Sequence, residues 1–300
     1  MATERGRAAV VGAAGFLGSA VHDELVRREV RVLPYTRARS FLAATSEVTT
    51  ADTVFWLASS IRPATASTDV AAGQSDLHAM GTLLDRLAAA PRRARCRVVV
   101  VSSGGTVYDA RQAPPHRETG TTRAVNDYGR AMLAVEDLVR ERAPEHTVLR
   151  VANAYGPGQV ARRGQGVIAH WLDAVARDEA ITVLGDDQLA RDYVYVDDVV
   201  AALVAVHEAH EPPPLLNIGS GVGTGLGELV DAVRATVAPL QVRVDRSPAR
   251  PFDAPSTWLA VDRAADILGW EPRVPLEEGL ARTWAARRPT AVPVAARAQQ

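Results

Sequence analysis

Three glycines near the start of the chain, within residues 12–18, follow one another at the spacing G-x-x-G-x-x-G. An apolar run at 8–11 precedes them, and residues 19–28 carry apolar side chains at helical spacing. In such a strand, turn and helix, the first glycine permits the tight turn, the second lets a pyrophosphate approach and the third lets the helix pack closely. The helix start adds free N–H groups and a partial positive charge. We predict a dinucleotide site that includes Gly12, Gly15, Phe16, Leu17 and Gly18.

The segment after the second apolar strand, residues 30–35, is basic and reads Thr36-Arg37-Ala38-Arg39. Folds that bind NAD usually carry an acidic residue near this place, which holds the ribose 2′-hydroxyl, and none is present. Arg37 and Arg39 could bind a 2′-phosphate instead, so we predict NADP(H) rather than NAD as the cofactor. The alternative is that both arginines are ordinary solvated loop residues.

The elements that must position these residues alternate between strand and helix over the first half of the chain. Residues 102–108 directly follow a continuous β-branched run at 97–101, which is typical of a buried parallel strand. They therefore lie at the carboxyl edge of the sheet, where α/β enzymes place their chemistry. We predict an α/β fold, with a Rossmann-type doubly wound parallel sheet. The expected strands are 8–11, 30–35, 54–58, 97–101 and 147–151, and the expected helices are 19–28, 76–90 and 124–142.

Beyond Pro157 the pattern loosens and indicates a smaller C-terminal lobe interleaved with returns to the sheet. Its expected strands are 181–184, 192–196 and 215–219, with a helix at 197–209. Residues 40–51 are too few for a full crossover, and 61–75 are expected to form a polar loop. We predict an NADP-binding domain over 1–156 with return segments near 192–219, a substrate-binding lobe over 157–191 and 220–288, and a disordered tail over 289–300.

Composition excludes several classes of function. The 300 residues are 47% hydrophobic and carry a net charge of −1, with no basic cluster for nucleic acid. The longest apolar stretch, 199–206, is too short for a membrane span, and the N-terminus does not resemble a signal peptide. The single cysteine, Cys96, excludes an internal disulfide and is expected in the core, which favours a cytoplasmic location. We predict no metal site. All 34 basic residues are arginine, which suggests a GC-rich genome.

Nine short segments of the chain, taken in order, resemble those of the extended short-chain dehydrogenase/reductase family, of the NAD(P)-dependent epimerase/dehydratase type. The resemblance runs from the glycine turn to about Trp270. It implies an extended Rossmann fold with cofactor contacts at Leu57, Ala58, Tyr128 and Met132. The matching segments are 10–18, 55–58, 102–108, 128–129 with Glu136, 150–157, 185–186, 191–198, 217–221 and 268–272.

The chain departs from this family at its catalytic residues. The family uses a Ser or Thr, a Tyr and a Lys four residues after the Tyr, often with an Asn on an earlier helix. Tyr128 is retained, but Met132 replaces the Lys and Gly104 replaces the Ser or Thr. His78 stands at the Asn position, where we expect an ordinary helix histidine rather than a proton carrier.

These losses discriminate among the family's reactions. Epimerases and dehydratases first oxidise a substrate alcohol, which needs a tyrosinate, and without the Lys that base is costly near neutral pH. A reductase needs a protonated donor beside the ketone oxygen, which an ordinary tyrosine supplies. We therefore predict an NADPH-dependent ketoreductase. Ser103 or Thr106 would hydrogen-bond the developing alkoxide, and Tyr128, the substrate's own hydroxyl or a water would donate the proton.

The substrate stays open between two interpretations. In sugar-nucleotide members of the family, residues matching Asn153, Arg191 and Arg250 hold the diphosphate, which implies a nucleotide-linked 4-keto-deoxyhexose reductase or epimerase. The absence of the family's Lys and Ser or Thr favours a ketone of an antibiotic intermediate as the substrate. An example is an aromatic polyketide whose neighbouring phenol could donate the proton. A third hypothesis is a non-catalytic NADP-binding regulator.

The helix bearing Tyr128 often forms a homodimer contact in this family. The predicted substrate-binding residues are Gly104, Tyr108, Asn153, Tyr155, Arg191 and Arg250.

Overall fold

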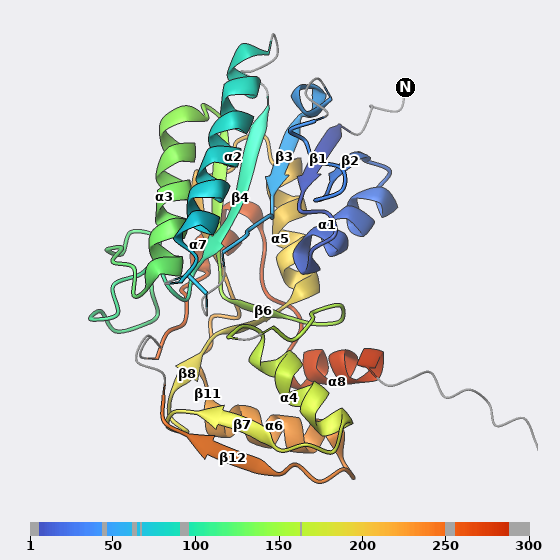
Figure 1. Cartoon of the computed structure of the whole chain (residues 1–300), viewed down its shortest axis with the longest axis vertical. Helices are drawn as coiled ribbons and strands as arrows, with labels where there is room; N and C mark the ends of the chain where they lie inside the picture. The colour runs from blue at the N-terminus through green and yellow to red at the C-terminus, as the bar shows by residue number, and fades with distance from the viewer. Residues whose placement is uncertain are drawn as a thin grey trace, which may run out of the picture.

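Six strands form one parallel sheet in the spatial order β10-β5-β4-β3-β1-β2 (Figure 1). Helices cover both of its faces, which is why its central strands are nearly continuous apolar runs. The strands are β1 (Arg7–Val11), β2 (Arg31–Tyr35), β3 (Thr53–Trp56), β4 (Arg97–Ser103), β5 (His146–Val151) and β10 (Leu215–Ile218). The structure is a computed structural model that describes residues 6–43, 47–61, 65–66, 68–90, 96–162, 164–249 and 256–287.

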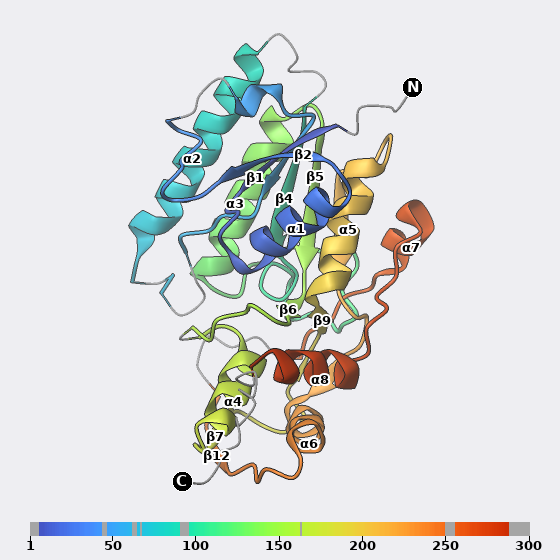
Figure 2. The ribbon, with the colours of Figure 1, turned by 90° about the vertical axis from the view of Figure 1, so that its right-hand side faces the viewer.

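Two pairs of helices sandwich the sheet (Figure 2). One face carries α1 (Phe16–Arg27) and α5 (Val196–Glu208), and the other carries α2 (Val70–Ala89) and α3 (Asp127–Arg142). Along β4, Val99 belongs to the core under α1 and α5, whereas Val98 and Val100 belong to the core under α2 and α3. Because successive side chains of a strand point to opposite faces, β1, β3 and β4 each contribute to both cores. The predicted doubly wound sheet is confirmed.

The strand order reverses beside β1. The chain leaves β1 for β2 on one side and then returns to β3 on the other. The second of these connections is short, as predicted, and its described residues hold a 3-10 helix, η1 (Val48–Thr50), but no α-helix. Ligands of doubly wound sheets bind outside the carboxyl ends of the strands at such a reversal. The glycine turn after β1 lies at this place.

A smaller lobe hangs below the carboxyl edge of the sheet (Figure 1). Two short strand pairs and three helices build it, and a further pair, β6 with β9, joins it to the sheet. The helix α7 (Asp262–Leu268) instead packs near β10. The strands are β6 (Asn153–Tyr155), β7 (Ile181–Leu184), β8 (Ala190–Arg191), β9 (Tyr193–Tyr195), β11 (Thr224–Gly225) and β12 (Val244–Ser247), and the helices are α4 (Val167–Ala176), α6 (Leu226–Val237) and α8 (Leu276–Arg287).

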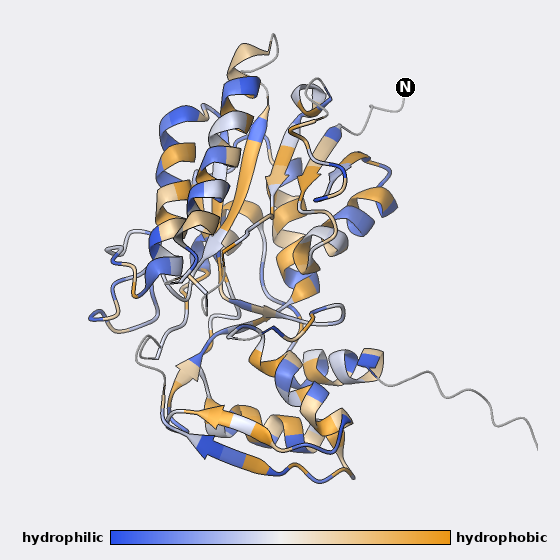
Figure 3. Cartoon of the chain, viewed as in Figure 1, coloured by the Kyte–Doolittle hydropathy of each residue, from blue (hydrophilic) through white to orange (hydrophobic). Residues whose placement is uncertain are grey.

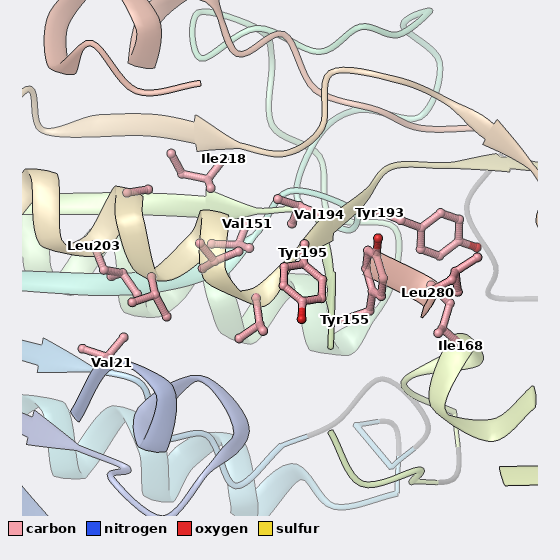
Figure 4. Close-up of a cluster of buried hydrophobic side chains, with 14 of the residues drawn as sticks. Val21, Val151, Tyr155, Ile168, Tyr193, Val194, Tyr195, Leu203, Ile218 and Leu280 are labelled. Carbon is pink, nitrogen blue, oxygen red and sulfur yellow. The ribbon is translucent and has the colours of Figure 1, made fainter. Parts of the chain in front are cut away.

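The sheet and the lobe share one hydrophobic core. Hydrophobic residues make up most of β4 and alternate with hydrophilic ones along the helices (Figure 3). The core under α1 and α5 continues into the lobe. At the junction Tyr155 meets Tyr195 edge-on, with ring centroids 5.6 Å apart, and lies close to Leu280 of α8 (Figure 4). A Cβ on Gly279 would collide with the Tyr155 hydroxyl, so this glycine permits the close approach of α8.

Several predicted elements differ in extent. Helix α2 begins at Val70 rather than at residue 76, because Asp69 caps it by accepting from the Ala72 N–H at 3.0 Å. The strand predicted at 192–196 is the shorter β9, which β8 precedes, and helices α4, α6, α7 and α8 were not predicted. The tail at 289–300 lies outside the described residues, and the domain boundary at 156 stays a prediction. No helix in the described ranges is long and apolar enough to cross a membrane.

Candidate active site

The glycine turn brings three backbone segments into contact. Gly12 has a φ of +97°, and a Cβ there would lie 2.8 Å from the Ala58 amide nitrogen and 2.9 Å from the Leu57 carbonyl carbon. A Cβ on Gly18 would collide with the Gly12 carbonyl. Only glycine at both positions lets α1 and the end of β3 approach the turn this closely.

The start of α1 has the features of a pyrophosphate site. Gly15 precedes the helix, no side chain caps it, and its first turn contains no acidic residue. The N–H groups of Phe16 and Leu17 have no acceptor within the described part of the chain. These donors and the helix dipole suit a phosphate oxygen, so the chain fits a dinucleotide here.

The two arginines after β2 have different surroundings. Arg37 is exposed, and no hydrogen bond or ion pair joins it to another residue that the structure describes. Arg39 pairs with Glu47 at 2.9 Å, and its guanidinium lies 5.9 Å from the centre of the Tyr35 ring. The Arg39 amide also donates to the Thr36 hydroxyl at 3.1 Å, which tightens the turn. Of the two, Arg37 is therefore the freer to bind an anion.

Ser103, Thr106 and Tyr128 come together at the carboxyl end of β4. The Thr106 hydroxyl donates to Ser103 Oγ at 2.9 Å, so Ser103 keeps its own hydrogen for another acceptor. The Val125 N–H donates to the Thr106 carbonyl at 3.1 Å, and a Cβ on Gly129 would collide with the same carbonyl. The first turn of α3, which carries Tyr128, is thus held against the Ser103–Thr106 loop.

Tyr128 lies in an environment that keeps its phenol protonated. Its ring is half-buried and packs on a cluster that includes Val107, Met132 and Leu259. Burial first, and then the negative charge of Asp76, raise the pKa of Tyr128 to about 12. The Tyr128 hydroxyl forms no hydrogen bond within the described ranges, so it is available to a substrate.

Gly104, the position at which the resemblance predicts a Ser or Thr, has a neighbouring side chain packed close to it. A Cβ at this position would lie 2.6 Å from Leu259 Cδ1 and 3.3 Å from the Arg150 carbonyl oxygen. Leu259 is fully buried and belongs to the cluster around Tyr128. A side chain at position 104 therefore requires Leu259 to move.

A buried polar network lies beneath this loop, and the sequence reasoning did not predict it. Glu136 is 0% exposed, pairs with Arg150 at 2.7 Å and also accepts from the Ser102 hydroxyl. The Arg150 guanidinium lies 4.9 Å from the centre of the Tyr108 ring, and the Tyr108 hydroxyl donates to Asn217 Oδ1 at 2.6 Å. The network connects β4, β5, α3 and β10 under Ser103.

The predicted substrate residues are spread over several environments. Tyr155 is buried, and its hydroxyl donates to the Leu276 carbonyl at 3.3 Å, which favours a packing role. Tyr108 is likewise buried in the network beneath the loop. Asn153 is exposed, but its amide donates to the Asp192 carbonyl at 2.9 Å. Arg191 Nη1 donates to the Ala190 carbonyl, and Arg250 lies outside the described residues.

The structure brings one further residue, Asp76, to the site. Asp76 is 8% exposed, and its carboxylate accepts from the Ser60 N–H at 2.8 Å, next to the end of β3. The sequence signal that could have found Asp76 is its spacing of four residues from the core residue Met80, which puts both on one face of α2. His78, two residues on, is exposed on α2. Within the described ranges, no group of His, Cys, Asp and Glu could hold a metal ion.

Comparison with known proteins places the chain in a family. Residues 8–219 match the NAD dependent epimerase/dehydratase family model. A UDP-glucose 4-epimerase of Mycolicibacterium smegmatis is 30% identical, with 92% of this chain and 97% of the relative covered. A dTDP-4-dehydro-6-deoxyglucose reductase of Escherichia coli is also 30% identical, over 61% of this chain and 59% of the relative.

A solved structure agrees with these relatives over nearly the whole chain. The UDP-glucose 4-epimerase of Thermotoga maritima, solved with UDP-glucose, superposes with a TM-score of 0.83 at 28% identity. The match covers 93% of this chain and 98% of that chain, so it includes both the sheet and the lobe. The chain belongs to the NAD dependent epimerase/dehydratase family and has its extended short-chain dehydrogenase/reductase fold.

Proposed function

We propose that this protein is an NADP(H)-dependent ketoreductase that reduces a ketone of an antibiotic intermediate to an alcohol. The observation that carries the proposal is the state of Tyr128, which has no lysine beside it and a pKa raised to about 12. A tyrosine of this kind is a poor base at neutral pH, so it disfavours oxidation of a substrate alcohol. It remains a hydrogen-bond and proton donor to a ketone oxygen.

In such a reduction, different residues at the carboxyl edge of the sheet would bind the cofactor, stabilise the alkoxide and donate the proton. The glycine turn, Phe16 and Leu17 would hold the pyrophosphate, and a bound nicotinamide cofactor supplies the hydride. Ser103, whose oxygen accepts from Thr106, would direct its own hydrogen at the developing alkoxide. Tyr128 would then protonate that oxygen. NADP(H) is favoured over NAD by the exposed Arg37, which has no partner within the described residues and suits a 2′-phosphate.

For the substrate we favour an aromatic polyketide ketone with a neighbouring phenol. Such a phenol can share or take over proton donation, which suits a site that lacks the family's lysine. The Asn153 amide, which a diphosphate would need, is already bonded to a backbone carbonyl.

A nucleotide-linked 4-keto-deoxyhexose is the second candidate. It is favoured by the relatives, which include a dTDP-4-dehydro-6-deoxyglucose reductase and a dTDP-6-deoxy-L-talose 4-dehydrogenase.

The test follows NADPH absorbance with purified protein and two sets of ketones, nucleotide-linked 4-keto-deoxyhexoses and polycyclic aromatic ketones. We expect oxidation with the aromatic set, and no change in its KM in Asn153→Ala. Turnover of the sugars alone, with a KM that rises in Asn153→Ala, would assign the second candidate. Tight NADPH binding with no turnover of either set would instead favour a regulator.

A further inference from the structure

Asp76 is a buried carboxylate to which the proposed reaction assigns no role. It accepts hydrogen bonds from the Ser60 N–H, at 2.8 Å, and the Ser59 hydroxyl, at 3.1 Å. No arginine or histidine of the described residues lies within ion-pair distance of it. Burial of a carboxylate without a cation is costly, and the hydrogen bonds from Ser59 and Ser60 offset part of that cost.

Asp76 and Met132 lie beside the same very small cavity. The two side chains, from α2 and α3, line one cavity of about 20 Å³ together with Ser59 and Ser102. That volume has room for about one water molecule. Tyr128 precedes Met132 by one helical turn, so both residues lie on the face of α3 that packs toward the sheet. Among the described residues, Asp76 is the charged group that raises the pKa of Tyr128, in addition to the effect of burial.

We propose that Asp76 is a positioning residue that restricts the site to proton donation. Its hydrogen bonds fix the Ser59–Ser60 segment, which follows the predicted cofactor contacts Leu57 and Ala58. Its negative charge lies next to Met132, so that Tyr128 acts only as a neutral donor. This proposal rests on the reductive function proposed above. In the donating step the Tyr128 O–H bond breaks, the alkoxide O–H bond forms, and the phenolate then takes a proton from water. An alkoxide is about as strong a base as hydroxide, so the transfer stays downhill.

The arrangement has a consequence for any attempt to restore the family's lysine. A lysine introduced at position 132 would meet the Asp76 carboxylate across the shared cavity. We expect the two to pair, which would leave the lysine little effect on Tyr128. Removal of the carboxylate charge should therefore be needed before a lysine can lower the pKa of the tyrosine.

The experiment compares Met132→Lys with Met132→Lys/Asp76→Asn in the full-length protein. Phenolate absorbance is followed against pH, and the matching Tyr128→Phe variant is subtracted to isolate Tyr128. We expect the double variant to titrate about one unit below Met132→Lys, since a charge at short range shifts a pKa by at least that much. Met132→Lys/Ser59→Ala is the matched control, because it removes one bond to Asp76 but keeps the charge, and it should titrate with Met132→Lys.

A second measurement reads the reaction direction. The double variant should oxidise the product alcohol with NADP⁺ about tenfold faster than Met132→Lys, the rate equivalent of one pKa unit. Equal titration of the single and double variants would overturn the proposal, as would an equal shift in the Ser59→Ala control. If Asp76→Asn fails to fold, as judged by circular dichroism, Asp76→Ser replaces it. A titration shift in a protein that reduces no ketone would refute the proposed function and leave intact only the effect of Asp76 on the pKa of Tyr128.

Discussion

Replacement of Arg150 by methionine should strongly destabilise the protein. Glu136 is 0% exposed and Arg150 is 3% exposed, and Glu136 accepts from Arg150 Nε at 3.1 Å and Nη2 at 2.7 Å. Arg150→Met leaves the Glu136 carboxylate buried with the Ser102 hydroxyl and the distant Arg140 as partners. Removal of one partner of a buried pair costs about 3–5 kcal/mol, a large part of the ~5–15 kcal/mol that stabilises a typical domain.

Chemical denaturation measures this loss as the change in the free energy of unfolding. Arg140→Met is the matched control, because Arg140 reaches the same carboxylate at 3.8 Å but is 54% exposed. An exposed pair contributes about 0–1 kcal/mol, so this variant should be nearly as stable as the wild type. Arg150→Met/Glu136→Leu should recover most of the stability by removing both charges. A loss below about 1 kcal/mol in Arg150→Met, or no recovery in the double variant, would refute this account of the network.

Three further predictions concern the site. Tyr128→Phe should lower kcat for ketone reduction by about 100-fold, the low end of the effect of a general acid; a loss of only a few-fold, measured by NADPH oxidation, would transfer proton donation to the substrate's own hydroxyl. Because the pKa of Tyr128 is raised to about 12, its phenol stays protonated from about pH 7 to about pH 10, so kcat should not fall over this range, and a decline with an apparent pKa near 10 would contradict the burial of Tyr128. Gly18→Ala should abolish NADPH binding in a fluorescence titration, because its Cβ would collide with the Gly12 carbonyl and open the turn, whereas Gly105→Ala, where a Cβ meets no atom within 4 Å, should bind NADPH normally.

The features that the sequence predicted well depend on local spacing. The glycine turn, β1 and the valine-rich β4 could be read from the sequence because their patterns lie within about ten residues. The start of α2 was misplaced because its capping residue, Asp69, follows a run of small polar residues that looks like loop. Helices α4 and α6 were missed although their apolar residues recur at helical spacing, so a local signal was present, whereas α8 carries only a weak apolar stripe.

The contacts that define the site could not be predicted, because they join residues far apart in the chain. Asp76 meets Ser60 across a loop, and Leu259 fills the space at Gly104 from a segment some 150 residues later. Nothing local to Glu136 indicates that its partner is Arg150 on the neighbouring strand. Gly104 and Met132 could be recognised as departures from the family pattern, but their consequences depended on which side chains pack around them.

The contact between Leu259 and Gly104 couples the side chains that these two positions can accept. A serine at position 104 would bring its Cβ within 2.6 Å of Leu259 Cδ1, so the end of the Leu259 side chain would have to shift. A smaller residue at 259 would make room for that serine but, with Gly104 unchanged, would leave a void in the cluster around Tyr128. The stability cost of a side chain at position 104 therefore depends on the residue at position 259, so an attempt to build a hydroxyl here should vary the two positions together.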